Sequence, residues 1–506
     1  MLAANEETIL YVSSHGPFEK GKDIVTRTAT GEIRAYQLKK GDIGLTEWRS
    51  IYGEIVNLVE LPIEFAGNPP ITDFVPYIVT NGELTDPVIE QVRAANISWQ
   101  SRGIGKTLHI IEKGQLFDSF RNAHGAYMPK ELVDFRTFLE LILREGAAPA
   151  DKEKAARLIE DILPAEPELA SVLNISRAAT SIALLTAYIT GPAALALNHW
   201  SVFEYWVLAG AYILHLIEKS KMAEAECQVS FEICELAAEG ALVAIAEESK
   251  DRTDLVQGFP LADSHVYRTR VTILIGLLSA LDLSLRIRQK PRGHSDFVKS
   301  FLDERLKESL CWGESAVPFF FLGMLFAEQN CNSPVAEGLA IQLIKDFSSL
   351  NGESGHGRGT SNPYYSPEES LRVIYGLDSL NDEMFIGLSY SIAPLVDFLA
   401  RRWRRRALAF LWFGITRMNL VDYVPANAAE WFRWRSSDGF LNSRLAGEPQ
   451  SWEALRNNAR NLSLEALPPT LVRRPAFALW YLLVYPHRFT PATAKLIDDA
   501  VMAAEG

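Results

Sequence analysis

The sequence predicts an α/β domain at the N-terminus, with a central mixed sheet flanked by helices, followed by a large all-α region. Short β-type runs recur through residues 1–145, and helical periodicity replaces them after the segment from Gly146 to Pro149. The chain has 506 residues, a length that suggests about two to four domains. We therefore expect an α/β domain over residues 1–145 and helices beyond it.

The N-terminal part alternates β-type runs with helical candidates. The predicted strands span residues 9–13, 24–28, 33–39, 74–80 and 108–112. Residues 47–61 and 86–95 form the predicted helices, and Thr85-Asp86-Pro87 is a good start for the second because proline suits a first helical turn. The sequence Ala29-Thr30-Gly31 predicts a tight hairpin between the second and third strands. This order is typical of a hairpin extended by strands that arrive through crossover helices.

The remainder of the chain shows apolar residues at helical spacing and no convincing strands. The predicted helices span residues 151–163, 193–219, 223–248, 265–289, 296–309, 334–350, 386–418, 451–462 and 491–504. A glycine- and serine-rich loop at 351–366 separates a helical region at 146–350 from another at 367–506, unless the two are continuous.

Composition limits the environment and the partners of the protein. The formal net charge of −13 excludes a polyanion-binding surface over the whole molecule, so such binding needs a local basic patch or metal ions. Four cysteines without a CxxC pair favour reduced thiols and a cytoplasmic location. Residues 178–203 carry no charge, but Gly191-Pro192 divides them, so we expect a buried helix pair and no membrane association.

The motif that carries chemistry is Asp23 followed by Gln37 and Lys39. Gln37 and Lys39 are two residues apart on a predicted strand, so they share a face, and the hairpin can bring Asp23 beside them. A carboxylate, an amide and an ammonium around one point suit a divalent cation that activates water for phosphodiester hydrolysis. The plain alternative is an ordinary hairpin with an exposed aspartate and lysine.

The segment from Phe18 to Val25, continued by Tyr36 to Lys40, resembles the catalytic core of the Mrr-type restriction endonucleases. These enzymes are a branch of the PD-(D/E)xK nuclease superfamily in which glutamine replaces the usual acid. The run from Tyr77 to Thr85 is similar to the third core strand and turn of that family, and the run from Leu108 to Leu116 to its last core strand. The resemblance covers roughly residues 9 to 120.

The resemblance implies a role for each residue of the motif. Asp23, Gln37 and the Leu38 carbonyl would hold Mg²⁺ or Mn²⁺, and Lys39 would position or activate the attacking water. Family members also carry a glutamate on a helix ahead of the hairpin, where this chain has few residues. Glu7 is our candidate for this additional metal ligand, with Glu6 and Glu19 as the other choices.

Basic residues supply the candidate nucleic-acid contacts. Lys22 and Lys40 flank the motif, and the run from Arg401 to Arg406 holds five arginines around Trp403. We assign nucleic-acid contacts to Arg401, Arg404 and Arg405, with Trp403 available for stacking. The competing interpretation is that these arginines form salt bridges inside an acidic protein.

The function expected from these observations is that of a metal-dependent endonuclease acting on DNA, with RNA as a second candidate substrate. A nuclease domain joined to a bulky helical region resembles the arrangement of restriction and anti-phage defence effectors. The helical region would sense a signal or bind a protein partner or activator, and a homodimer would pair two active sites. The alternative is a nuclease fold with an incomplete acidic site that only binds nucleic acid or protein.

Overall fold

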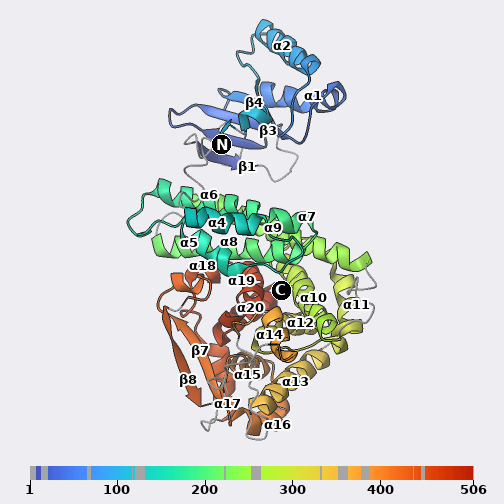
Figure 1. Ribbon diagram of the computed structural model, residues 1–506, viewed down its shortest axis with the longest axis vertical. Coiled ribbons are helices and arrows are strands. Elements are labelled where there is room, and N and C mark those ends of the chain that lie inside the picture. Colours follow the sequence, from blue (N-terminus) through green and yellow to red (C-terminus); the bar gives the residue numbers. More distant parts are fainter. Residues whose placement is uncertain are drawn as a thin grey trace. The chain divides into compact units, whose positions relative to one another are not determined.

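The computed structural model describes residues 7–12, 21–64, 70–116, 118–119, 132–220, 224–251, 264–330, 333–351, 363–377, 388–436, 438–445 and 451–504. The chain divides into two compact units, Met1–Lys130 and Glu131–Gly506 (Figure 1). Helix α4 (Leu132–Ile142) packs on α5 (Lys152–Glu160) and α6 (Val172–Ile189). The division therefore precedes the boundary expected at residue 145, because this helix belongs to the second unit.

The first unit is built on a sheet of five strands in the order β1-β2-β3-β4-β5. Strands β1 to β3 are antiparallel neighbours, and β4 and β5 join them in parallel. This confirms the predicted mixed sheet, with each strand close to its expected place. The strands are β1 (Thr8–Val12), β2 (Ile24–Arg27), β3 (Ile33–Lys39), β4 (Val75–Thr80) and β5 (His109–Ile111).

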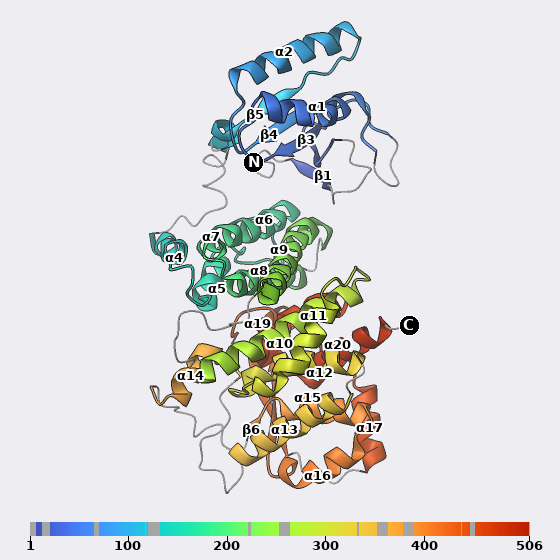
Figure 2. The same ribbon diagram turned by 90° about the vertical axis from the view of Figure 1, so that its right-hand side faces the viewer.

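Two crossover helices, α1 (Leu45–Glu60) and α2 (Asp86–Ser101), lie on one face of this sheet (Figures 1 and 2). They share a face because the chain moves in one direction across the sheet, from β3 to β4 to β5, and such crossovers have one hand. Apolar residues from both helices and from the facing side of the strands form the core, including Val25, Ala35 and Ile78. Side chains at alternate strand positions are consequently directed either to the helices or to the opposite face.

The hairpin between β2 and β3 closes through local hydrogen bonds. Thr28 N donates to Glu32 O at 2.9 Å, and Gly31 N donates to Thr28 O at 2.9 Å. Gly31 has φ +90°, a conformation that glycine adopts without steric cost. The turn thus sets the register in which Val25 lies opposite Ala35 and Ile24 opposite Tyr36.

The second unit is largely helical, as predicted. In addition to α4, α5 and α6 it contains α7 (Gly191–Leu195), α8 (His199–Ser220), α9 (Glu224–Asp251), α10 (Ser264–Ile287), α11 (Ser295–Arg305), α12 (Val317–Gln329), α13 (Ser333–Asn351), α14 (Pro367–Ile374), α15 (Ile392–Arg401), α16 (Arg405–Ile415), α17 (Trp452–Asn461), α18 (Pro469–Val472), α19 (Pro475–Val484) and α20 (Pro491–Ala503). Four short 3₁₀ helices in the described residues are η2 (Leu306–Glu308), η3 (Glu314–Ala316), η5 (Ala429–Trp431) and η6 (Pro486–Arg488). Of the loop predicted at 351–366, residues 352–362 lie outside the described residues.

Two helices, α6 and α8, are long and apolar enough to cross a membrane by length and composition. Helix α8 packs against α9 and α6, and 89% of its most apolar 18-residue window is buried inside the protein. The uncharged stretch divides where Gly191-Pro192 predicts, since α6 ends at Ile189 and α7 begins at Gly191.

The expectation that the second unit lacks strands is wrong. A small sheet in the order β6-β7-β8 lies beside the helices, with β7 and β8 paired antiparallel (Figure 1). Its strands are β6 (Leu388–Ser389), β7 (Asn419–Pro425) and β8 (Gly439–Leu445). The single helix predicted over residues 386–418 is accordingly replaced by β6, α15 and α16, and Trp403, at φ +59°, separates the two helices.

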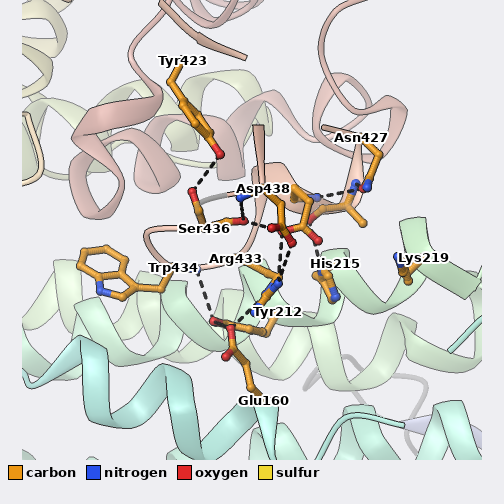
Figure 3. Close-up of polar contacts among 12 residues, drawn as sticks. Glu160, Tyr212, His215, Lys219, Tyr423, Asn427, Arg433, Trp434, Ser436 and Asp438 are labelled. Carbon is orange, nitrogen blue, oxygen red and sulfur yellow. Dashed lines mark hydrogen bonds and ion pairs between the residues drawn. The ribbon is translucent and has the colours of Figure 1, made fainter. Parts of the chain in front are cut away.

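A polar network joins η5 and the following segment to α5 and α8. The Arg433 guanidinium lies between Glu160 at 3.0 Å and Glu430 at 3.3 Å, with Asp438 at 3.6 Å (Figure 3). Tyr212 of α8 donates to the same Glu160 carboxylate at 2.7 Å. Burial raises the pKa of Tyr212 well above its ordinary value, so the phenol keeps the proton that this bond needs.

We expect Arg433→Ala to lower the free energy of unfolding of the second unit by about 1–3 kcal/mol. The loss arises because Glu430, which is 5% exposed, would remain buried without its cation. The matched control is Arg157→Ala, which removes an exposed i,i+4 pair with Glu153 and is expected to change stability by less than about 0.5 kcal/mol. Chemical denaturation followed by circular dichroism measures both, and equal losses would contradict the prediction.

Candidate active site

Asp23 and Gln37 meet across the β2–β3 pair on the face of the sheet that carries α1. The paired register ends with Ile24 opposite Tyr36, and Asp23, directly before β2, donates its backbone N–H to Tyr36 O at 2.8 Å. The Asp23 carboxylate accepts a hydrogen bond from Gln37 Nε2 at 2.9 Å and another from the Leu38 backbone N–H at 2.6 Å. The hairpin therefore brings together the three residues assigned to metal binding by resemblance.

One oxygen at this point has no hydrogen-bond partner among the described residues. Gln37 is 5% exposed, and while its Nε2 donates to Asp23, its Oε1 is buried and unpaired. An unpaired buried carbonyl oxygen costs about 1–3 kcal/mol unless a ligand or water compensates. The Leu38 carbonyl points to the same side as its N–H, toward Asp23, because both groups of a strand residue share a direction.

Lys39 lies on the same strand face as Gln37 and forms an ion pair with Glu54 of α1. The lysine side chain is 20% exposed and the glutamate 51%, so both reach solvent. Sequence reasoning did not find Glu54, because its closeness to Lys39 results from the packing of α1. The available signal was its helical position, three residues after Ile51 and four before Leu58, at the edge of the apolar face.

Gly21 allows the chain before Asp23 to pass directly against α1. Its φ is +74°, and a Cβ there would lie 3.0 Å from Leu58 N and closer still to the Glu54 carbonyl oxygen. The neighbouring Lys22 and Lys106 donate from Nζ to Asn57 O at 3.1 Å and to Val59 O at 3.0 Å. These ammonium groups satisfy carbonyls in the last turn of α1, where positive charge is favourable. Burial lowers the pKa of Lys106.

The donor set fits a hard divalent cation. Asp23 offers a carboxylate, Gln37 an amide oxygen and Leu38 a backbone carbonyl, which are the oxygen ligands that Mg²⁺ and Mn²⁺ take together with water. Within the described ranges no group of three or more histidine, cysteine, aspartate or glutamate side chains could hold a metal ion. A cation here would thus depend on the amide, the backbone carbonyl and water.

The assignment of Glu7 as a metal ligand is corrected. Its carboxylate accepts hydrogen bonds from Tyr36 OH at 2.8 Å, Thr26 Oγ1 at 2.6 Å and Arg34 Nη1 at 2.8 Å. Arg34 and Tyr36 alternate with Ala35 and Gln37 along β3, so Glu7 lies on the opposite face of the sheet.

That opposite face carries its own aromatic stack. Tyr77 lies 5.1 Å from Tyr36 and 5.2 Å from His109, measured between ring centroids. Burial and the Glu7 carboxylate raise the pKa of Tyr36, which keeps the phenol protonated as a donor. A cavity of about 330 Å³ lies beside these rings, and the sheet separates it from Gln37.

Two lysines assigned to nucleic-acid contact differ in their surroundings. Lys22 is 2% exposed, and its ammonium donates to the Asn57 carbonyl in the last turn of α1. Its assignment to nucleic-acid contact is therefore corrected. Lys40 is exposed at the end of β3 and remains available for contact.

The arginine cluster is divided between internal and external roles. Arg401 is 9% exposed and pairs with Asp498 at 2.9 Å, while Arg404 pairs with Glu328 at 3.5 Å and Glu337 at 3.3 Å. The assignments of Arg401 and Arg404 are corrected, because these charges join helices inside an acidic protein. Arg405 is exposed, and the described residues give it no acidic partner.

Comparison of the chain with protein-family models, curated proteins and solved structures finds no significant match.

Gly21→Ala is expected to destabilise the first unit by about 2–4 kcal/mol, because a methyl group would strike the backbone of α1 in addition to straining φ. Gly31→Ala is the matched control. It imposes a similar φ penalty at +90° but meets no atom within 4 Å, and about 1 kcal/mol is expected. Thermal unfolding of both variants measures the difference, and equal shifts would show that the close approach to Glu54 is unimportant.

Proposed function

We propose that the protein is a metal-dependent endonuclease that hydrolyses phosphodiester bonds in DNA, with its active site at Asp23, Gln37, Leu38 and Lys39. The observation that carries the proposal is the buried Gln37 Oε1, which has no hydrogen-bond partner among the described residues and belongs to the side chain that donates to the Asp23 carboxylate. A glutamine oriented by an aspartate, with its carbonyl oxygen free, suits cation coordination better than it suits a hairpin without a ligand. RNA is the second candidate substrate.

The fold of the first unit supports the restriction-endonuclease-like interpretation at the level of element order. An antiparallel hairpin is followed by two parallel strands, each reached through a helix on the same face. In the proposed site the candidate residues occupy the hairpin and the end of its second strand. Element order is an argument from architecture, and the chemistry of the site carries the functional part.

The proposed mechanism gives each side chain one task. A bound Mg²⁺ would supply a Lewis acid and lower the pKa of a coordinated water. Asp23, Gln37 Oε1 and the Leu38 carbonyl would hold the ion. Lys39 would orient the attacking water and stabilise the charge that develops on the phosphate, and Glu54 fixes the lysine in position through its ion pair.

The helical unit would sense a signal or bind a partner or activator that releases the nuclease, as in restriction and anti-phage defence effectors. A homodimer that pairs two sites is part of the same proposal. The second candidate is a nuclease fold that binds without cutting. It is favoured by the few acidic ligands in the described part of the chain, where Asp23 and Glu54 are the carboxylates placed at the site and Glu54 is already paired. The other candidates, Glu6 and Glu19, lie outside the described residues.

Lys39→Ala is expected to reduce Mg²⁺-dependent cleavage of plasmid DNA by at least about 10²-fold, because the water and the phosphate lose their cation. Arg93→Ala is the control: this exposed cation of α2 pairs with Glu90 and is not among the assigned contacts, so its variant should retain most of the activity. Cleavage is followed by gel electrophoresis. Equal activity in the wild type and Lys39→Ala would refute the assignment.

Asp23→Asn is expected to weaken Mn²⁺ binding by at least about 10-fold in isothermal titration calorimetry, since it removes the anionic ligand. Asp86→Asn, an exposed change in the first turn of α2, should bind as the wild type does. Metal binding that depends on Asp23, without cleavage of DNA or RNA, would support the binding-module candidate. Metal binding unaffected by Asp23→Asn would contradict both.

A further inference from the structure

Helix α16 presents one face to the protein and the other to solvent. Its buried face consists of Ala407, Leu408, Leu411 and Ile415. Two phenylalanines lie on the other side, and they are among the most exposed large apolar residues of the described chain: Phe410 is 70% exposed and Phe413 69%. Rings exposed to this extent contribute little to folding and are available for contact.

Cations lie on either side of these rings. Arg406, Phe410 and Phe413 follow one another at steps of four and three residues on α16, so they form a line about 10 Å long, and Arg417 lies in the turn directly after the helix. The Arg417 guanidinium lies 3.8 Å from the Phe413 ring centroid, and Lys345 of α13 lies 4.9 Å from that of Phe410. We call Arg406, Phe410, Phe413 and Arg417 the α16 stripe.

A second aromatic–cation group lies at the N-terminal end of α16. Trp403 is 59% exposed, and the guanidinium groups of Arg456 and Arg460 on α17 lie 3.1 Å and 5.5 Å from its ring centroid. Helices α16 and α17 both pack on α15, and they lie at the same end of the second unit in both views (Figures 1 and 2). The cations of this group and of the stripe have no carboxylate partner within the described ranges, unlike Arg401 and Arg404.

We propose that the α16 stripe and Trp403 bind single-stranded nucleic acid. Cations without acidic partners can accept phosphates, and exposed rings beside them can stack with unpaired bases, which is the combination that single-strand-binding surfaces use. The chain carries a net charge of −13, so this concentration of unpaired cations is a local departure from a surface that otherwise repels polyanions.

The arrangement of charges favours this partner over a lipid surface. A helix that inserts into a membrane buries an apolar face and keeps its cations on the other side or at the rim. Here the exposed apolar face of α16 is limited to the Phe410 and Phe413 rings, with cations at both ends, and because membrane binding scales with the apolar area buried, insertion would gain little. Duplex DNA would satisfy the cations but would leave the rings without base faces, since paired bases are stacked on one another.

This inference deepens the proposed nuclease and rests on it for its purpose: the helical unit would hold the strand that the first unit cuts, or the strand that triggers cutting. Binding itself requires neither the metal nor Lys39. The two proposals can therefore fail separately.

The test is fluorescence anisotropy of the full chain with a labelled oligothymidylate of ~20 nucleotides in EDTA, beside a duplex of equal length. We expect the single strand to bind more tightly. Phe410→Ala with Phe413→Ala should weaken its binding about 5- to 100-fold through lost stacking. Arg406→Gln with Arg417→Gln should weaken it and reduce the slope of log K against log salt concentration by about 1.4.

Controls separate the stripe from general effects. Leu195→Ala, at a residue that is 90% exposed, and Arg157→Gln should bind as the wild type does. Because the assay contains EDTA and measures binding and not cleavage, a nuclease proposal that fails would leave this one standing. Each variant should unfold at the same temperature as the wild type, because the substituted side chains are exposed.

Three results would overturn the inference. The first is a wild-type protein that does not bind the single strand, and the second is equal affinity in the wild type and both double variants. The third is tighter binding to vesicles containing anionic lipid, or to an acidic peptide, than to the oligonucleotide, with that binding lost in the phenylalanine variant.

Discussion

The register between β2 and β3 is the constraint on which the N-terminal site depends. It holds Asp23 beside the end of β3, where the Asp23 carboxylate accepts hydrogen bonds from the Gln37 side chain and from the Leu38 backbone N–H. A slip of one residue would turn Gln37 and Lys39 to the opposite face, among the stacked rings beside Glu7. The turn at Gly31 and the burial of the paired core residues Val25 and Ala35 fix this register. The positions of the site residues therefore depend on correct pairing of the two strands.

The sheet could be predicted because its signals are local. Turn residues, β-branched runs and the helix start at Thr85 each act within a few positions of the chain, and all five strands and both crossover helices were found close to their true places. The small sheet of the second unit was missed for the opposite reason. Strand β7 follows directly after a long helical pattern, and it pairs with β8 across an irregular segment. The break before α16 depends on the left-handed backbone conformation of Trp403, and the presence of a tryptophan does not predict that conformation.

In the candidate site, too, features set by local spacing could be predicted, and features set by tertiary packing could not. Period-two spacing on one hairpin was sufficient to bring Asp23, Gln37 and Lys39 together. It could not reveal Glu54, whose position depends on how α1 packs, or reject Glu7, whose side chain lies on the face of the sheet opposite Gln37. Charge alone misled the assignment of Lys22, Arg401 and Arg404, because an internal cation and a surface cation look alike until their acidic or carbonyl partners are placed. Within the described ranges, Arg405 and Arg406 of α16 and Arg456 and Arg460 of α17 have no carboxylate partner.

Helix α1 has a consequence for how this chain can change. It supplies the Glu54 carboxylate to Lys39, its backbone leaves no room for a side chain at position 21, and its last turn receives Lys22 and Lys106. Substitutions at these positions are therefore coupled: a shift of the helix that accommodated a larger residue at Gly21 would separate Glu54 from Lys39. Among related sequences, Gly21, Lys22 and Glu54 should be retained together or replaced together, and a relative that keeps Asp23 and Gln37 while varying the other three independently would argue that α1 does not serve the site.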